Sequence, residues 1–239
     1  MKNTLIHLFI FLFFASGSIA QTPQYHWMNQ LGGTGFENGG YIAVDHEGFV
    51  YTISSMKTDI FFKPFTPKEY KVTKTTAASI DDLVLTKVDA AGNLVWLKQI
   101  PGPIGGTSIA ADSDNNLIIV GSYKSTVDFD PGPGVYNQTA KDLNDIFILK
   151  LDKNGDFIWA GSIGGKNNDR ATSVIVDQND NIALVCLISD TVDFDMSTTV
   201  VYNLIATSPF EEAVLKISSS GKFLWAYHTK RHSADSNSF

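Results

Sequence analysis

Two short segments carry pairs of carboxylates whose spacing could hold a cation. Asp128 and Asp130 stand two residues apart, and Asp193 and Asp195 repeat the arrangement further along the chain. In an extended chain, side chains two residues apart point to the same side, and calcium is bound by carboxylate and carbonyl oxygens. We therefore put forward the hypothesis that these four aspartates bind calcium, and we predict no other cofactor. The alternative is that the phenylalanine inside each pair is buried while the acids face water.

Other aspartates stand at the start of short polar segments that have the composition of turns. A calcium loop of the EF-hand type needs alternating acids and a late glutamate, whereas 112–116 runs straight into an apolar segment. An aspartate at the start of a turn commonly accepts hydrogen bonds from its own backbone. We therefore predict turns, and no metal ligands, at the segments that begin at Asp45, Asp89, Asp112, Asp152 and Asp177.

The residue types that serve in catalysis are scattered along the chain. The five histidines form no recurrent nucleophile motif with serine or cysteine. Cys186 lies in an apolar run, which is typical of an inert buried cysteine. Glu211 and Glu212 replace Asn144 and Asp145 of the preceding repeat, so this pair marks the start of a strand. No catalytic constellation is found, and we predict that the chain is not an enzyme.

Composition excludes several classes of partner and site. The 239 residues are 44% hydrophobic and 18% charged, which is typical of a folded globular chain. A net charge of −7 without a basic cluster argues against binding to nucleic acid. A single cysteine excludes a disulfide framework and a cysteine-rich zinc site.

The first twenty residues have the three-part pattern of a secretory signal peptide. Lys2 supplies the positive start, an apolar run follows over 5–15, and small residues precede a cleavage site after Ala20. The apolar run is shorter than the roughly 20 residues that a membrane span needs. We therefore expect residues 1–20 to be removed, and the remaining chain to be exported without a membrane span.

Four tryptophans reveal an internal repeat of about 65 residues. They stand at Trp27, Trp96, Trp159 and Trp225, and each of the last three ends a β-hairpin with a turn that contains glycine. A second hairpin follows the glycine-rich stretch after each of the first three tryptophans. Each period therefore holds four antiparallel strands in meander order, and four-stranded units in tandem are typical of β-propeller blades.

The predicted fold is all-β, with about three propeller-type blades plus one strand, open or incomplete. The repeats occupy 21–229, with blades at about 30–99, 100–163 and 164–228, a lone strand near 25–31 and a polar tail at 230–239. Because meander strands alternate in direction, short turns share one side of the blades. The long connections at 55–81, 123–144 and 189–211 share the other side, where we expect any binding face.

The hairpin 148–160, the Gly164-Gly165 pair and the paired segments 127–132 and 192–195 resemble repeats of exported β-propeller proteins of Bacteroidetes, the SBBP-like repeats. The resemblance implies a surface or adhesin-like role. Many such proteins end in a C-terminal sorting domain, and nothing after Trp225 looks like one, so we expect a fragment of a longer protein. The alternative is an open arc of three blades that oligomerises.

The hairpins that end in tryptophan also look like the tryptophan motif of quinone-dependent dehydrogenase propellers. That family often uses a vicinal cysteine pair, which the single Cys186 excludes, so we interpret the motif as blade packing. We predict a non-enzymatic module with a binding or scaffold role at the bacterial cell envelope or surface. Its partner would be a protein or a glycan, with self-association through open blades as a further possibility. The alternative is a fragment of a quinoprotein-like or glycan-active enzyme.

Overall fold

The structure is a computed structural model that describes residues 27–33, 38–63, 69–77 and 80–229. Within these ranges the chain forms seventeen strands and no helix, which confirms the all-β prediction. Accordingly, the described part of the chain contains no helix long and apolar enough to cross a membrane. The expected signal peptide (1–20) and the polar tail (230–239) lie outside the described residues.

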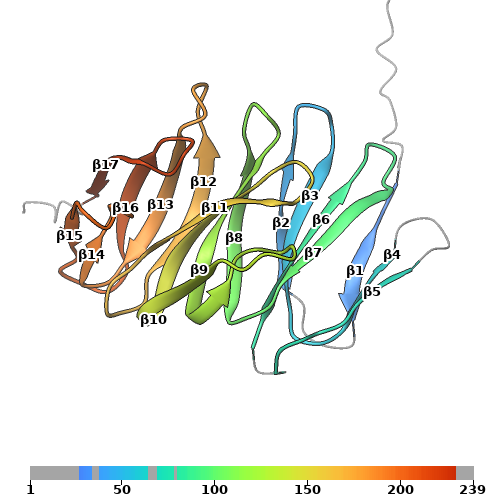
Figure 1. The fold of residues 1–239 in the computed structure, drawn as a ribbon, viewed down its shortest axis with the longest axis horizontal. Helices are drawn as coiled ribbons and strands as arrows, with labels where there is room; N and C mark the ends of the chain where they lie inside the picture. Colours follow the sequence, from blue (N-terminus) through green and yellow to red (C-terminus); the bar gives the residue numbers. More distant parts are fainter. Residues whose placement is uncertain (1–26, 34–37, 64–68, 78–79, 230–239) are drawn as a thin grey trace, which may run out of the picture.

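Twelve strands form three four-stranded antiparallel sheets in chain order, which we call blades 1, 2 and 3 (Figure 1). Blade 1 contains β2 (Asn38–Val44), β3 (Val50–Met56), β6 (Asp82–Val88) and β7 (Leu94–Ile100). Blade 2 contains β8 (Ile104–Ala111), β9 (Leu117–Asp128), β10 (Asn137–Leu151) and β11 (Phe157–Ile163). Blade 3 contains β12 (Arg170–Val176), β13 (Ile182–Ile188), β16 (Glu211–Ile217) and β17 (Phe223–His228). The prediction of tandem propeller-type blades is confirmed, and the three blades form an open row.

One local pattern builds the hairpin turns, which lie together on one side of the row (top of Figure 1). In blade 2, Asp112 Oδ1 accepts hydrogen bonds from the backbone N–H groups of Asp114 at 3.0 Å and Asn116 at 2.8 Å. The same pair of bonds, to the residues two and four positions ahead, recurs at Asp45, Asp89, Asp152 and Asp177. These bonds confirm that the five aspartates are turn residues.

The long connections fold into short ribbons instead of irregular loops. Between β3 and β6, β4 (Ile60–Lys63) pairs with β5 (Tyr70–Val72). Between β13 and β16, β14 (Thr191–Asp193) pairs with β15 (Asn203–Ile205). In blade 2 the ribbon is an extension of β9 and β10, in which Asp128 pairs with Asn137. Paired backbone fixes these segments, so each blade carries an ordered ribbon.

The lone strand expected near 25–31 is not isolated. The strand observed is β1 (Gln30–Gly33), which pairs antiparallel with β4. Leu31 packs against a buried cluster that contains Met56, Ile60 and Val84. Burial of this apolar side chain, together with the free edge of β4, draws the segment into a sheet on the side of blade 1.

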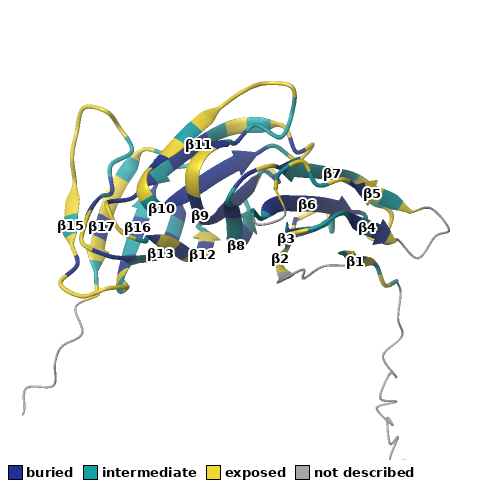
Figure 2. Cartoon of the chain, turned by 90° about the horizontal axis from the view of Figure 1, so that it is seen from below, coloured by how far each residue is buried: buried dark blue, intermediate teal, exposed yellow. Residues whose placement is uncertain are grey.

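The core lies between the blades, and blade 2 is covered on both sides. Every residue of β10 from Ile146 to Leu151 is buried, and alternate side chains enter two different clusters. Ile146 and Ile148 pack toward blade 3, whereas Phe147 and Leu149 pack toward blade 1. In Figure 2 the buried residues (dark blue) of β6, β9 and β10 lie along the middle of the row. Each blade therefore depends on its neighbours for burial of its faces.

Candidate functional site

The first acid pair lies in the ribbon of blade 2 and holds its tip together. Asp128 Oδ1 accepts hydrogen bonds from the N–H of Asp130 at 3.1 Å and from the N–H of Tyr136 at 2.7 Å. Asp130 Oδ1 accepts from the N–H of Gly132 at 2.7 Å. Both carboxylates are therefore acceptors for backbone groups that would otherwise lack a partner.

The second pair repeats this arrangement in blade 3. Asp193 Oδ1 accepts from the N–H of Asp195 at 3.1 Å and from the N–H of Tyr202 at 2.8 Å. Asp195 Oδ1 accepts from the N–H of Ser197 at 2.8 Å. The two pairs thus sit at equivalent places in consecutive repeats, and they lie in separate ribbons.

The phenylalanine between the two acids of each pair is a buried core residue. Phe129 and Phe194 are 0% exposed. Phe129 meets the ring of Tyr123 edge-on at 5.2 Å and the ring of Phe147 at 5.3 Å. Among the described ranges, no group of three or more His, Cys, Asp or Glu side chains is placed to hold a metal ion. The carboxylates have a structural role without metal, and calcium binding stays a prediction.

Two substitutions at Asp128 separate these roles. An asparagine oxygen can still accept the two N–H bonds, whereas alanine cannot. If the carboxylate serves only to accept these backbone hydrogen bonds, the free energy of unfolding of Asp128→Asn should lie within about 0.5 kcal/mol of the wild-type value. That of Asp128→Ala should be lower by about 1–3 kcal/mol. Chemical denaturation with calcium or with a chelator measures both. Calcium stabilisation that Asp128→Asn abolishes would establish the metal site instead.

On the side of the long connections, blade 3 carries a pocket of about 410 Å³ that is lined by both polar and apolar residues. Its lining includes the side chains of Asn167, Ser189 and Asp190, and the ring of Phe210 stands half exposed at 50%. Phe210 has a φ of 61°, in a region that disfavours aromatic residues. The Oγ of Ser189 accepts its N–H at 3.2 Å, and the guanidinium of Arg170 lies 5.6 Å from the ring centroid. These contacts hold an aromatic ring at the pocket.

Blade 2 has a smaller pocket at the equivalent place. Its volume is about 270 Å³, and its lining includes Asp81, Ser122, Lys124 and Asn144. Asn144 and Phe210 occupy equivalent positions, directly before Asp145 and Glu211. The strand pairings align Glu211 with Asp145, so the sequence alignment of Glu211 with Asn144 was wrong by one residue. The repeat therefore places a pocket with polar side chains beside each of two consecutive blades.

Beneath the pockets, an acid at the start of the third core strand of each blade is held by the fourth strand. Gln99 Nε2 donates to Asp82 Oδ2 at 2.8 Å, and Ser162 Oγ donates to Asp145 Oδ2 at 3.4 Å. In blade 3 the corresponding residues are Glu211 and His228, which lie 3.9 Å apart. There the carboxylate instead accepts hydrogen bonds from the N–H groups of Thr207 and Ser208, both at 2.8 Å. The repeat alignment pointed to these acids as strand starts, but their partners three residues after each tryptophan were missed. That spacing is the signal that could have found them.

Asp169 is a buried acid beneath the pocket of blade 3, and its pKa is raised. It is 1% exposed, and it accepts hydrogen bonds from the N–H groups of Gly165 at 2.9 Å and Ser189 at 2.8 Å. Burial raises its pKa to about 6, with a further increase from the nearby Asp145 carboxylate, and the two N–H bonds oppose this shift. Asp169 therefore links the segments around Gly165 and Ser189 below the pocket, and its side chain is not accessible to solvent.

The raised pKa of Asp169 makes stability depend on pH. Because the folded-state pKa lies above the usual 3.8, protonation favours the fold, and this contribution is lost as the pH rises through about 6. Lowering the pH from 7 to 5 should therefore raise the free energy of unfolding by about 1 kcal/mol through this group. Asp169→Asn should remove that slope in urea titrations at both pH values. An unchanged slope would mean that Asp169 titrates normally.

Comparison with known proteins gives similarities to two longer proteins. No protein-family model matches the chain. Over 191 residues it is 29% identical to an uncharacterized WD repeat-containing protein of Acanthamoeba polyphaga mimivirus, covering 64% of this chain. Over 148 residues it is 26% identical to the regulatory protein FlaEY of Caulobacter vibrioides, covering 61% of this chain. The chain spans 14% of the length of each of these proteins. Together with the three blades, the similarity to the WD repeat-containing protein supports a repeat fold of propeller type.

Proposed function

We propose that the chain is an exported, non-enzymatic binding module that acts at the bacterial cell envelope or surface. The observation that carries the proposal is the recurrence of a pocket on the side of the long connections, at equivalent places beside blades 2 and 3. Function tends to reside in connections displayed on a rigid scaffold. Pockets at equivalent places beside two consecutive blades suit a long ligand that contacts more than one blade.

The chemistry of the pocket beside blade 3 favours a glycan as this ligand. Asn167, Ser208 and Asp190 offer amide, hydroxyl and carboxylate groups, which pair with sugar hydroxyls. The exposed ring of Phe210 offers an apolar face against which the C–H groups of a sugar can pack. A protein segment is the alternative ligand, and the WD repeat-containing relative supports a scaffold role in either case. Export and a location at the envelope or surface rest on the signal-peptide pattern of residues 1–20.

An array of immobilised oligosaccharides tests the proposal. The wild-type chain should be retained by a subset of oligosaccharides, and Phe210→Ala should weaken that retention about tenfold, which corresponds to about 1.4 kcal/mol. Tyr41→Ala is the matched control, because Tyr41 is similarly exposed (48%) but lies on blade 1. Retention of no oligosaccharide, or equal loss in both variants, would count against a glycan site at this pocket.

A further inference from the structure

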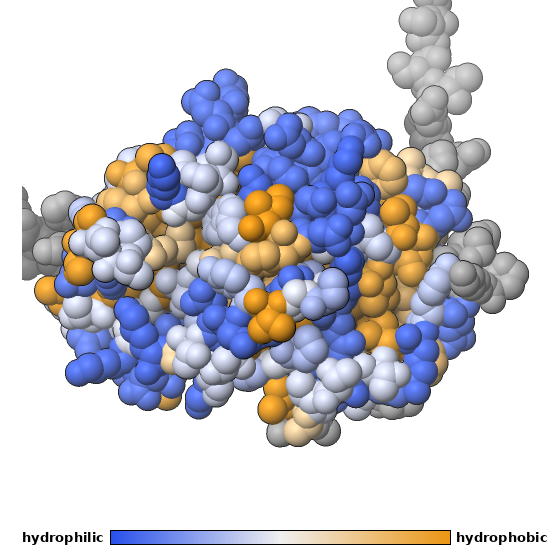
Figure 3. Space-filling view, viewed as in Figure 1, coloured by the Kyte–Doolittle hydropathy of each residue, from blue (hydrophilic) through white to orange (hydrophobic). Residues whose placement is uncertain are grey.

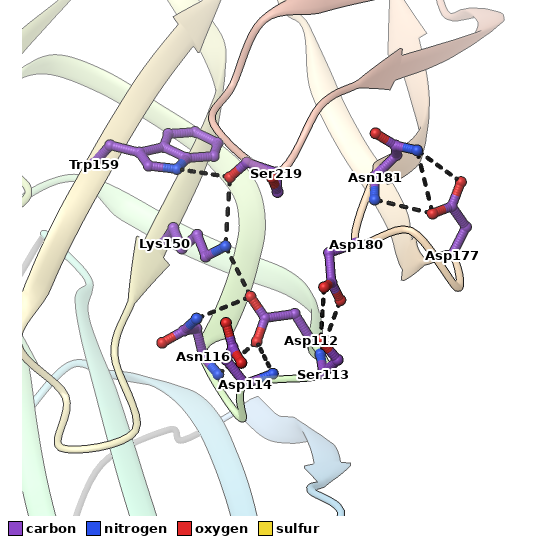
Figure 4. Close-up of polar contacts among 10 residues, drawn as sticks. All are labelled: Asp112, Ser113, Asp114, Asn116, Lys150, Trp159, Asp177, Asp180, Asn181 and Ser219. Carbon is purple, nitrogen blue, oxygen red and sulfur yellow. Dashed lines mark hydrogen bonds and ion pairs between the residues drawn. The ribbon is translucent and has the colours of Figure 1, made fainter.

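Three tryptophans make the same contact with the blade that follows them. In each case the indole Nε1–H donates to the carbonyl of the second residue of the turn between the third and fourth strands of the next blade. The three bonds run from Trp27 to Ala90 at 2.9 Å, from Trp96 to Lys153 at 3.2 Å, and from Trp159 to Ser219 at 3.2 Å. Figure 4 shows the last of these beside Lys150.

The turn that receives the tryptophan is shaped for it. Its fourth residue is a glycine with positive φ: 82° at Gly92, 79° at Gly155 and 82° at Gly221. A Cβ at Gly92 would lie 2.6 Å from Cγ of Trp27, so the ring and the turn are in close contact. The indole and the glycine turn therefore form a recurring joint between successive blades.

The last tryptophan has the same position in its blade, which is the last blade of the described residues. Trp225 is 41% exposed and stacks on Tyr227, with ring centroids 5.4 Å apart. By contrast, Trp96 and Trp159 are partly buried against the two main core clusters. Trp225 thus lies in the outward surface of blade 3, at the end of the described row.

The sheet face next to Trp225 lacks the cover that the same face has in blade 2. Ile118, Val120 and Ile148 of blade 2 are 0% exposed because blade 3 packs on them. The strand pairings put Val185 and Val214 of blade 3 at the positions of Val120 and Ile148, and both are partly exposed. Figure 3 shows hydrophobic surface at this end of the molecule (left). We call Val185, Val214 and Trp225 the end face.

We propose that the end face docks onto blade 1 of a second copy of this chain. There Trp225 takes the place of Trp27 on the turn 89–92, which already receives an indole in the structure. The Trp27 bond is solvent-exposed, and blade 1 also exposes Ile42 (65%) and Val44 (59%), so the exchange adds buried apolar surface. The contact repeats the joint between blades of one chain.

Such a contact is head-to-tail, and head-to-tail contacts generate rings when the rotation closes. Two copies that each contribute the three described blades would give six blades, a number within the range of about 4–8 found in closed propellers. The expected assembly is therefore a dimer. The inference is independent of the proposed ligand pocket, because Trp225 does not line that pocket.

Light scattering after size-exclusion chromatography, over a range of protein concentrations, tests the proposal. The wild-type chain should pass from one to two chain masses as concentration rises. Trp225→Ser and Val185→Asp should each raise the dissociation constant at least tenfold, while near-ultraviolet spectra report that the monomer stays folded. Trp27→Ser should lower the dissociation constant, because it vacates the receiving turn.

Leu224→Ser is the matched control. Leu224 is 47% exposed and adjoins Trp225, but its equivalents Val95 (50%) and Ile158 (43%) stay exposed even where a next blade is present. Its substitution should leave the dissociation constant unchanged. A single chain mass at all concentrations, association that survives Trp225→Ser, or weaker association of Trp27→Ser would each overturn the proposal.

Discussion

Replacing Lys150 with methionine is expected to lower the free energy of unfolding by about 3 kcal/mol. The Nζ of Lys150 lies 2.7 Å from Asp112 Oδ2, and the two side chains are only 8% and 2% exposed. The same ammonium donates to the carbonyl of Ser219 in blade 3 at 3.4 Å, so it connects two blades (Figure 4). Methionine keeps the length of the side chain but leaves the Asp112 carboxylate buried without its cation.

The next repeat supplies the control for this substitution. Lys216 and Asp177 form the equivalent pair at 2.7 Å, but their side chains are 25% and 29% exposed. Exposed ion pairs contribute little because water and salt screen them, so Lys216→Met should destabilise the protein several-fold less. Urea denaturation of both variants measures the difference. Equal losses would mean that burial of the pair in blade 2 is not what makes it important.

Phe129→Ala is the second substitution with a large expected effect. The side chain is 0% exposed and contacts the rings of Tyr123 and Phe147. Truncating a buried phenylalanine costs about 3–5 kcal/mol, because it removes apolar burial and leaves a cavity. We therefore expect a loss of this size, together with faster proteolysis of the ribbon between β9 and β10.

The tip of the same ribbon provides a matched control. Val135 is 72% exposed, so Val135→Ala should change the free energy of unfolding by no more than about 0.5 kcal/mol. Thermal unfolding and limited trypsin digestion of the two variants test the role of the buried Phe129 side chain. If Phe129→Ala kept wild-type stability, the ribbon would be held by its hydrogen bonds alone.

The strand order could be predicted because each repeat carries its own markers. The tryptophans fixed the register, and aspartates at turn starts marked the hairpins, so the four strands of each blade followed from local patterns. The role of Asp112 as a turn residue was likewise local, since its bonds reach only two and four residues ahead. Local patterns of this kind are what sequence alone specifies best.

Contacts between distant segments could not be predicted in the same way. The pairing of β1 with β4 joins segments about thirty residues apart, and nothing in either marks the other as its partner. The pocket of blade 3 depends on the conformation of Phe210, which has a positive φ and donates its N–H to Ser189, a residue 21 positions earlier in the chain. The joint between Trp159 and Ser219 needed the placement of whole blades before it could be seen.

The architecture has a consequence for how a binding face evolves on this scaffold. The turn side and the blade core are fixed by repeated bonds, whereas the residues before the third core strand differ between repeats, from Asn144 to Phe210. Changes at these positions alter the pocket without altering the joints between blades. Each repeat can therefore present a different pocket on the same framework.

The most direct test of the binding account is a chemical-shift map recorded with the oligosaccharide that the array retains most strongly. We expect the perturbed amides to gather on the side of the long connections, at 167–168, 189–190 and 206–210, with a second group near Asn144. Amides of the turn 112–115 on the opposite side should not move. Perturbations confined to the turns, or an array that retains no oligosaccharide at all, would contradict the account.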